Sequence, residues 1–123
     1  MTMPIVRDRT VPIAIVAPAG RLDALTAPAL RERCSNLVDQ GTIRLVIDLE
    51  AVDFMDSAGL AVLVRALRAA RSSGGDVKLS APTASSVARI LELTRFDRVF
   101  DIAATADAAA DRFLSTHAPG ARR

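Results

Sequence analysis

Apolar residues recur along the chain in two alternating patterns, short β-branched runs and longer stretches with helical spacing. Runs of strand length cover residues 12–17, 43–49, 77–80 and 99–102. Stretches with helical spacing cover residues 26–39, 58–72, 83–93 and 104–115. Strands that alternate with helices predict an α/β fold in which helices pack on a sheet. Whether the first strand starts earlier, near Ile5, is left open.

The run at residues 43–49 differs from the other strand candidates because it is almost continuously apolar. A strand with one face in water alternates apolar and polar side chains, whereas a strand covered on both faces does not. We therefore expect this strand to lie at the centre of the sheet.

The helix predicted at residues 58–72 begins at or next to Ser57 and has two distinct faces. Its inward side chains are expected to be Leu60, Leu63, Val64, Leu67 and Ala70. Its outward side chains are expected to be Ala58, Ala61, Val62, Arg65 and Ala69. Most exposed helix faces carry more charge than this one. Alanine is also simply a strong helix former, so the smooth face is only a candidate interface.

Composition limits the chain to one compact unit without a nucleic-acid partner. The 123 residues are 50% hydrophobic, enough for one core. There is no Trp or Tyr to stack on bases, and the net charge is only +2. We expect one domain over residues 1–117, a flexible tail over residues 118–123 and no direct contact with nucleic acid.

Cellular location follows from two further features. Cys34 is the only cysteine, which excludes an internal disulfide, and its surroundings favour a small buried apolar side chain. The longest apolar runs, such as residues 58–64, are far shorter than the ~20 residues that span a bilayer. We expect a cytoplasmic protein with no membrane insertion.

The sequence contains no pattern that specifies an enzyme or a cofactor. His117 is the only histidine and lies almost in the tail, so a Ser-His-Asp arrangement would have to use a poorly held residue. Phosphate-binding glycine loops and clusters of metal ligands are absent from the sequence. We predict a binding protein, with no catalytic residue, no metal and no cofactor.

Ser57 is the most informative residue, because it lies where a buried strand turns into a helix N-terminus. Serine is a preferred N-cap, and losing a cap costs about 1 kcal/mol, which alone would explain its presence. A phosphate would add about −1.5 to −2 charges at a position that favours anions, so the fold would tolerate it. A partner docking there would instead have to desolvate the phosphate or be repelled by it.

The segment Asp53-Phe54-Met55-Asp56-Ser57-Ala58-Gly59-Leu60 resembles the signature of bacterial anti-sigma-factor antagonists, members of the STAS domain family. The loop at residues 20–23 and the segment at residues 94–100 resemble further parts of that family. The resemblance implies a single STAS-type domain, with a mixed sheet of about four to five strands and about four helices.

This resemblance also implies a function in partner switching. In its unphosphorylated state such a protein binds an anti-sigma factor that is itself a serine/threonine kinase, and thereby frees the sigma factor. The kinase then phosphorylates Ser57, and a metal-dependent serine phosphatase resets the switch. Asp23 and Asp56 would flank the site and shape the loop that meets the kinase, although both also fit turn and capping roles.

Two residues depart from the family pattern. Ala58 replaces a second small hydroxyl residue that many members have, and Arg95 stands where glycine is common. Two alternatives remain open: a STAS structural subunit of a lipid transporter or stress-sensing complex, and a phosphoaspartate receiver domain using Asp48. The receiver is disfavoured because no acid pair follows the first strand to hold Mg²⁺.

Overall fold

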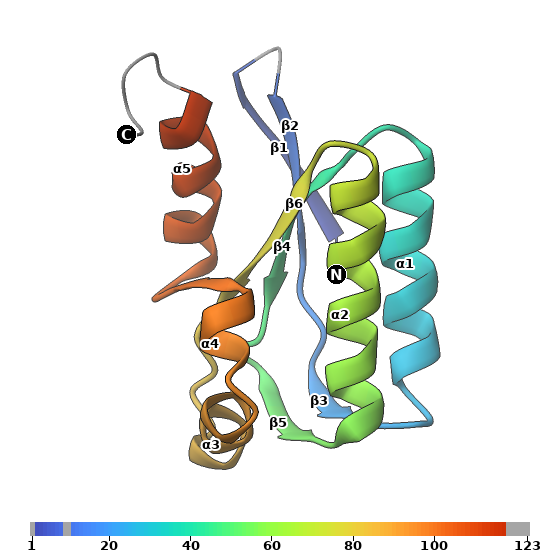
Figure 1. The fold of residues 1–123 in the computed structure, drawn as a ribbon, viewed down its shortest axis with the longest axis vertical. Helices are drawn as coiled ribbons and strands as arrows, with labels where there is room; N and C mark the ends of the chain where they lie inside the picture. Colours follow the sequence, from blue (N-terminus) through green and yellow to red (C-terminus); the bar gives the residue numbers. More distant parts are fainter. Residues whose placement is uncertain (1, 9–10, 118–123) are drawn as a thin grey trace.

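The computed structural model describes residues 2–8 and 11–117 and confirms the α/β fold (Figure 1). Within these residues the elements are β1 (Thr2–Asp8), β2 (Val11–Val16), β3 (Gly20–Leu22), α1 (Ala27–Asp39), β4 (Arg44–Asp48), β5 (Val52–Met55), α2 (Ser57–Ser72), β6 (Asp76–Ser80), α3 (Ser85–Leu93), α4 (Phe96–Val99), β7 (Asp101–Ala103) and α5 (Ala106–His117).

The main sheet has the strand order β1-β2-β4-β6-β7 and is mixed. β1 runs antiparallel to β2, whereas β2, β4, β6 and β7 run parallel to one another. β4 lies in the middle, as its continuous apolar run predicts. Its side chains alternate between two separate cores, with Leu45 and Ile47 in one and Val46 in the other.

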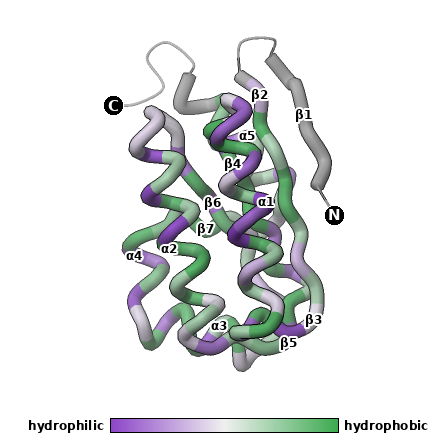
Figure 2. The backbone as a smooth tube through the Cα atoms, turned by 90° about the vertical axis from the view of Figure 1, so that its right-hand side faces the viewer, coloured by the Kyte–Doolittle hydropathy of each residue, from purple (hydrophilic) through white to green (hydrophobic). Residues whose placement is uncertain are grey.

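The two cores correspond to two helical layers. α1 and α2 cover one face of the sheet, and α5 covers the other (Figure 1). Coloured by hydropathy, the central strands are mostly hydrophobic while the helices alternate between hydrophobic and hydrophilic residues (Figure 2). This is the pattern expected of a sheet sandwiched between amphipathic helices.

The structure answers one question that the sequence left open and corrects three details of the predicted fold. β1 is a separate strand paired with β2 and not an earlier start of the same strand. β3 and β5 were missed, because neither contains an apolar run of strand length. α4 occupies part of the segment predicted as the last strand, so that β7 is confined to Asp101–Ala103.

The last element that the structure describes is α5, which ends at His117. The tail predicted for residues 118–123 lies outside the described residues. Among the helices that the structure describes, none combines the length and the apolar character needed to cross a membrane.

Candidate functional site

A small parallel pair of strands, β3 and β5, positions the N-terminus of α2. Leu22 of β3 pairs with Met55 of β5, and the chain passes from Met55 through Asp56 into α2. Gly20, with φ of +76°, begins β3 and donates its N–H to the carbonyl of Ala51 at 2.9 Å. The helix therefore starts from a fixed platform at one end of the molecule (Figure 1).

The N-cap of α2 is Asp56, and not Ser57 as the sequence suggested. Asp56 has an extended backbone, and its Oδ1 accepts hydrogen bonds from the N–H groups of Ala58 at 2.9 Å and Gly59 at 3.4 Å. Because these bonds satisfy two amides that have no intrahelical partner, the carboxylate performs the capping role that serine was expected to play.

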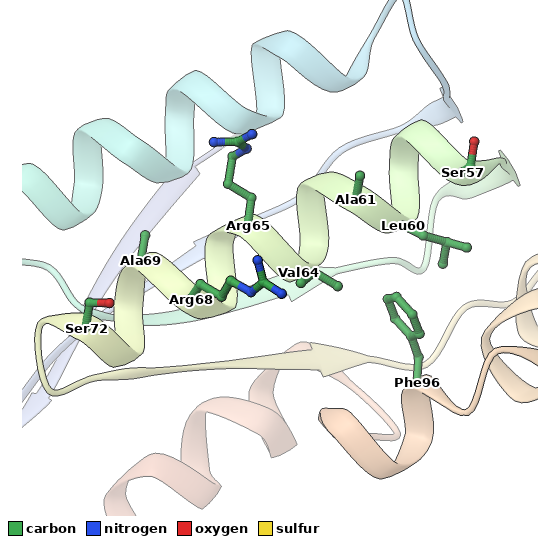
Figure 3. A pocket seen from close by; sticks show the side chains of 9 residues that line it. All are labelled: Ser57, Leu60, Ala61, Val64, Arg65, Arg68, Ala69, Ser72 and Phe96. Carbon is green, nitrogen blue, oxygen red and sulfur yellow. The ribbon is translucent and has the colours of Figure 1, made fainter.

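Ser57 is left free by this arrangement. It is the first residue of α2 and is exposed, and its hydroxyl makes no hydrogen bond to any residue that the structure describes. Figure 3 shows the hydroxyl at the end of the helix, pointing away from Phe96 of α4. The side chain is therefore open to modification without loss of a structural contact.

Gly59 explains why the first turn of α2 can lie so close to β3. A Cβ at this position would lie 2.6 Å from the carbonyl oxygen of Leu22 and 2.7 Å from Cγ of Met55. Both distances are below any normal contact, so only glycine fits. The same contact places the loop that follows Leu22 next to the start of α2.

Asp23 organises that loop through its side chain. Its Oδ1 accepts from the N–H groups of Leu25 at 3.0 Å and Thr26 at 3.3 Å, and its Oδ2 accepts from Nε of Arg21 at 3.1 Å. The Arg21 guanidinium holds the pKa of the Asp23 carboxyl below its usual value, with support from the hydrogen bonds of Leu25 and Thr26. Asp23 thus shapes the loop through turn hydrogen bonds, which was one of the two interpretations of this residue, and its contact with a kinase stays a prediction.

The loop presents one residue that the sequence analysis did not single out. Leu25 is 90% exposed, the largest exposure among the large apolar side chains described. The guanidinium of Arg21 lies 3.9 Å above the ring of Phe54, which ties the loop to β5. This outward apolar side chain was not detectable in the sequence, because its exposure depends on the loop geometry.

The outward face predicted for α2 is correct in part. Ala61 and Arg65 are exposed, and Ala69 is half-buried. Val62 was wrongly placed there, because it is 4% exposed and lies on the side of α2 that packs against α1. Ala58 is half-buried against the core, so it offers a partner only part of its surface.

Two residues predicted to point inward instead line an open groove. Leu60 and Val64 are half-buried, and together with Phe96 of α4 they border a hollow of about 700 Å³. Figure 3 shows Phe96 pointing from α4 towards α2, on the side of Leu60 and Val64. The remaining lining residues all belong to α2: Ser57, Ala61, Arg65, Arg68, Ala69 and Ser72. Arg68 and Phe96 were not among the predicted site residues.

Cys34 and Asp48 are both accounted for by the fold. Cys34 is 2% exposed, as predicted, and burial raises the pKa of its thiol to about 11, so the reactive thiolate is disfavoured. Asp48 accepts a hydrogen bond from Oγ of Ser80 at 2.5 Å and another from the N–H of Glu50 at 3.0 Å. Its carboxylate fastens the turn after β4 to the neighbouring strand.

Comparison with known proteins places the chain in a family. The model of the STAS domain matches residues 4–109. The chain belongs to the STAS domain family. This assignment confirms the resemblance noted in the sequence and excludes the receiver-domain alternative.

The relatives of this STAS domain are named as anti-sigma factor antagonists. It is 35% identical over 89 residues to the anti-sigma-B factor antagonist of Bacillus subtilis, covering 72% of this chain and 80% of the relative. It is 33% identical over 94 residues to the anti-sigma-F factor antagonist RsfB of Mycobacterium tuberculosis, covering 76% and 75%. The crystal structure of an anti-sigma factor antagonist from Mycobacterium paratuberculosis superposes with a TM-score of 0.73 at 28% identity, covering 91% of this chain and 93% of that one.

Proposed function

We propose that this STAS domain is an anti-sigma-factor antagonist whose binding is controlled by phosphorylation of Ser57. Unphosphorylated, it binds an anti-sigma factor serine/threonine kinase and releases the sigma factor. The kinase then transfers phosphate to Ser57, and a metal-dependent serine phosphatase removes it. The observation that carries this proposal is the exposed, unpartnered hydroxyl of Ser57 at the first residue of α2.

The position of Asp56 determines where a phosphate on Ser57 would point. Its carboxylate already accepts from the amides of Ala58 and Gly59, so a phosphate on Ser57 would find these donors occupied. Like charges repel, and the dianion would be held outward from the helix end and from Asp56. It would therefore stand in the path of a docking partner while leaving the fold intact.

Such a switch needs only a small free-energy penalty on partner binding. A partner that covers Ser57 would have to desolvate the phosphate, and about 3 kcal/mol of penalty lowers the affinity roughly 100-fold. The first turn of α2 favours anions, so the same group would not destabilise the domain. The modification is thus expected to act on binding and hardly on folding.

The decisive experiment incubates the protein with ATP and an anti-sigma factor serine kinase from the same organism, followed by phosphopeptide mass spectrometry. We expect phosphate on Ser57, and none on the Ser57→Ala variant. Ser57→Ala should bind the kinase persistently and, because Asp56 is the cap, should change the free energy of unfolding by no more than about 0.5 kcal/mol. Ser57→Asp should fold normally and bind more weakly in calorimetry.

Ser85→Ala is the matched control, because Ser85 is an exposed serine at the first residue of another helix, α3, and lies outside the hollow along α2. It should be phosphorylated on Ser57 and bind as the wild type does. Equal kinase affinity of the phosphorylated and unphosphorylated proteins would contradict the proposal. So would recovery of a transporter ATPase, and no sigma-regulating kinase, as the stable partner.

A further inference from the structure

We propose that the groove between α2 and α4 binds an acidic amphipathic helix of the anti-sigma factor kinase, with Arg65 and Arg68 as its charge-selective rim. The inference rests on the proposed function and adds the chemistry of the partner segment. It concerns the long side of α2, whereas the phosphorylation argument concerns only its first residue.

The charge of α2 is entirely of one sign. Its sixteen residues contain three arginines and no aspartate or glutamate. Arg71 is paired with Asp76 at 3.1 Å, but Arg65 and Arg68 form no hydrogen bond or ion pair with the described part of the chain. Both exposed guanidinium groups border the hollow, with Arg65 directed towards α1 and away from Phe96 (Figure 3), and both attract acidic and repel basic segments.

The floor of the groove is apolar and extends along the helix. Leu60, Val64 and Phe96 form one half, next to Ser57. A second hollow continues it past Arg68 to Ser72 and is bordered by Leu67 and by Val99 of α4, which is 43% exposed. Together they follow the 16 residues of α2, about 24 Å, which is long enough for four turns of a partner helix.

The occupant suited to this surface is a helix from another protein. Backbone groups within α2 are hydrogen-bonded internally, so the groove offers no free row of donors and acceptors to an extended strand. A helix satisfies its own backbone and can insert an apolar stripe while its acidic residues reach the arginines. A second copy of this chain is disfavoured as the occupant, because packing α2 against α2 would place Arg65 and Arg68 near the same arginines of the other copy, where like charges repel.

This placement also connects the groove to phosphorylation. Ser57 lines the same hollow as Arg65 and Arg68. A phosphate adds about −1.5 to −2 charges, which offsets the two unpaired positive charges of the rim. Phosphorylation would then weaken the attraction for an acidic helix through the field of the groove, in addition to any direct blocking at Ser57.

The test uses opposite charges at Ala61, which is exposed and lies between Ser57 and Arg65. Calorimetry with the full-length kinase that phosphorylates Ser57 should show Ala61→Glu binding about tenfold more weakly than wild type. Ala61→Lys, of similar length, should lose less affinity than Ala61→Glu, because its charge attracts an acidic helix. Ala88→Glu, on the exposed side of α3, should bind as wild type.

Removal of the rim charges gives a second measurement. Arg65→Gln and Arg68→Gln should each weaken binding about three- to tenfold at low salt, and the difference should shrink as NaCl rises to about 0.5 M. Arg89→Gln, which removes the same charge from the exposed face of α3, should leave affinity unchanged. Hydrogen exchange should show protection of α2 and α4 and of a helical kinase segment rich in Asp or Glu.

Several outcomes would overturn the inference while leaving the proposed function in place. One is equal loss of affinity in Ala61→Glu and Ala61→Lys, which would indicate steric contact without charge selection. Another is protection of a basic or neutral kinase segment. A third is full kinase affinity in the arginine variants combined with loss of retention on phosphatidylserine vesicles, which would assign the arginines to a membrane. A wild-type protein that neither binds the kinase nor is phosphorylated would overturn both.

Discussion

Basic side chains gather in two regions of the molecule, and the two regions use them in opposite ways. Under α5, Lys78 is 6% exposed, its Nζ lies 3.1 Å from Oδ2 of Asp101, and it stands 4.7 Å from the ring centre of Phe113. Along α2, Arg65 and Arg68 are exposed and have no partner among the described residues. The positive charge of the first region forms ion pairs within the fold, whereas that of the second region remains available to bind a partner.

The difference follows from how each charge is placed by the backbone. Parallel pairing of β6 with β7 sets Lys78 opposite Asp101, and Arg112 of α5 also reaches Asp101. A buried ammonium must be paired, since its desolvation is otherwise costly. The arginines of α2 lie on the solvent side of a helix, where water satisfies them and no such requirement exists. Each region can therefore be tested by a change that should affect one property and spare the other.

The largest effect on stability is expected for Asp101→Ala. Among the described residues, this change leaves Lys78 with Asp76, whose Oδ2 is 3.9 Å from Nζ, and it also removes the Asp101 partner of Arg112. Because Asp101 is itself partly exposed, we expect a loss of about 2 kcal/mol in the free energy of unfolding, below the usual cost of breaking a fully buried pair. Urea titration measures it, with Asp101→Asn as the milder variant.

Kinase affinity of Asp101→Ala, measured well below the unfolding transition, should remain within about twofold of wild type. A large loss of affinity at unchanged stability would show that the α5 side takes part in recognition. That result would remove the contrast between the two regions.

Gly59→Ala is expected to lower both the stability of the fold and its affinity for the kinase. The free energy of unfolding should fall by about 1 to 2 kcal/mol. Alanine is the better helix former by about 1 kcal/mol, but its Cβ would be forced against the carbonyl of Leu22. The first turn of α2 must move away from β3, carrying Ser57 with it, so kinase affinity should fall as well. Ser85→Ala, at the exposed first residue of α3, should change neither quantity. A stabilised Gly59→Ala would contradict the close contact.

The sequence was sufficient to predict the elements whose apolar pattern is long and regular. The central strand β4 and the helices α1 and α2 begin and end within a few residues of the predicted bounds. The start of α2 at Ser57 was also predicted correctly, because a serine after a strand and before an apolar helix is a local pattern. These features depend on neighbours in the sequence.

What escaped the sequence depends on contacts between distant segments. β3 and β5 are three and four residues long and exist because they pair with each other. Val62 is buried because α1 packs on that side of α2, which the helical period of α2 alone does not reveal. The groove includes Phe96 of α4, which lies some thirty residues beyond the midpoint of α2 in the chain. α4 was not predicted, because its short apolar segment is also typical of a strand.

The smallest effect is expected for Arg95→Gly, at the entrance of α4. Arg95 has φ of 62° and ψ of 29°, a left-handed conformation that costs an L-residue roughly 1 to 2 kcal/mol and glycine almost nothing. Glycine also loses more freedom on folding, by about 0.4 to 1 kcal/mol, so the net gain should be near 0.5 to 1 kcal/mol. Thermal unfolding should show a rise in Tm of a few degrees.

Arg98→Gly is the matched control, because it removes the same charge from an exposed position inside α4. There glycine should destabilise by up to about 1 kcal/mol, since the backbone is already helical. Kinase affinity of Arg95→Gly should stay within about twofold of wild type, because Arg65 and Arg68 carry the charge selection and Phe96 keeps its place. A fall in Tm for Arg95→Gly would contradict this prediction. It would mean that contacts of the Arg95 side chain stabilise the fold by more than the left-handed backbone conformation destabilises it.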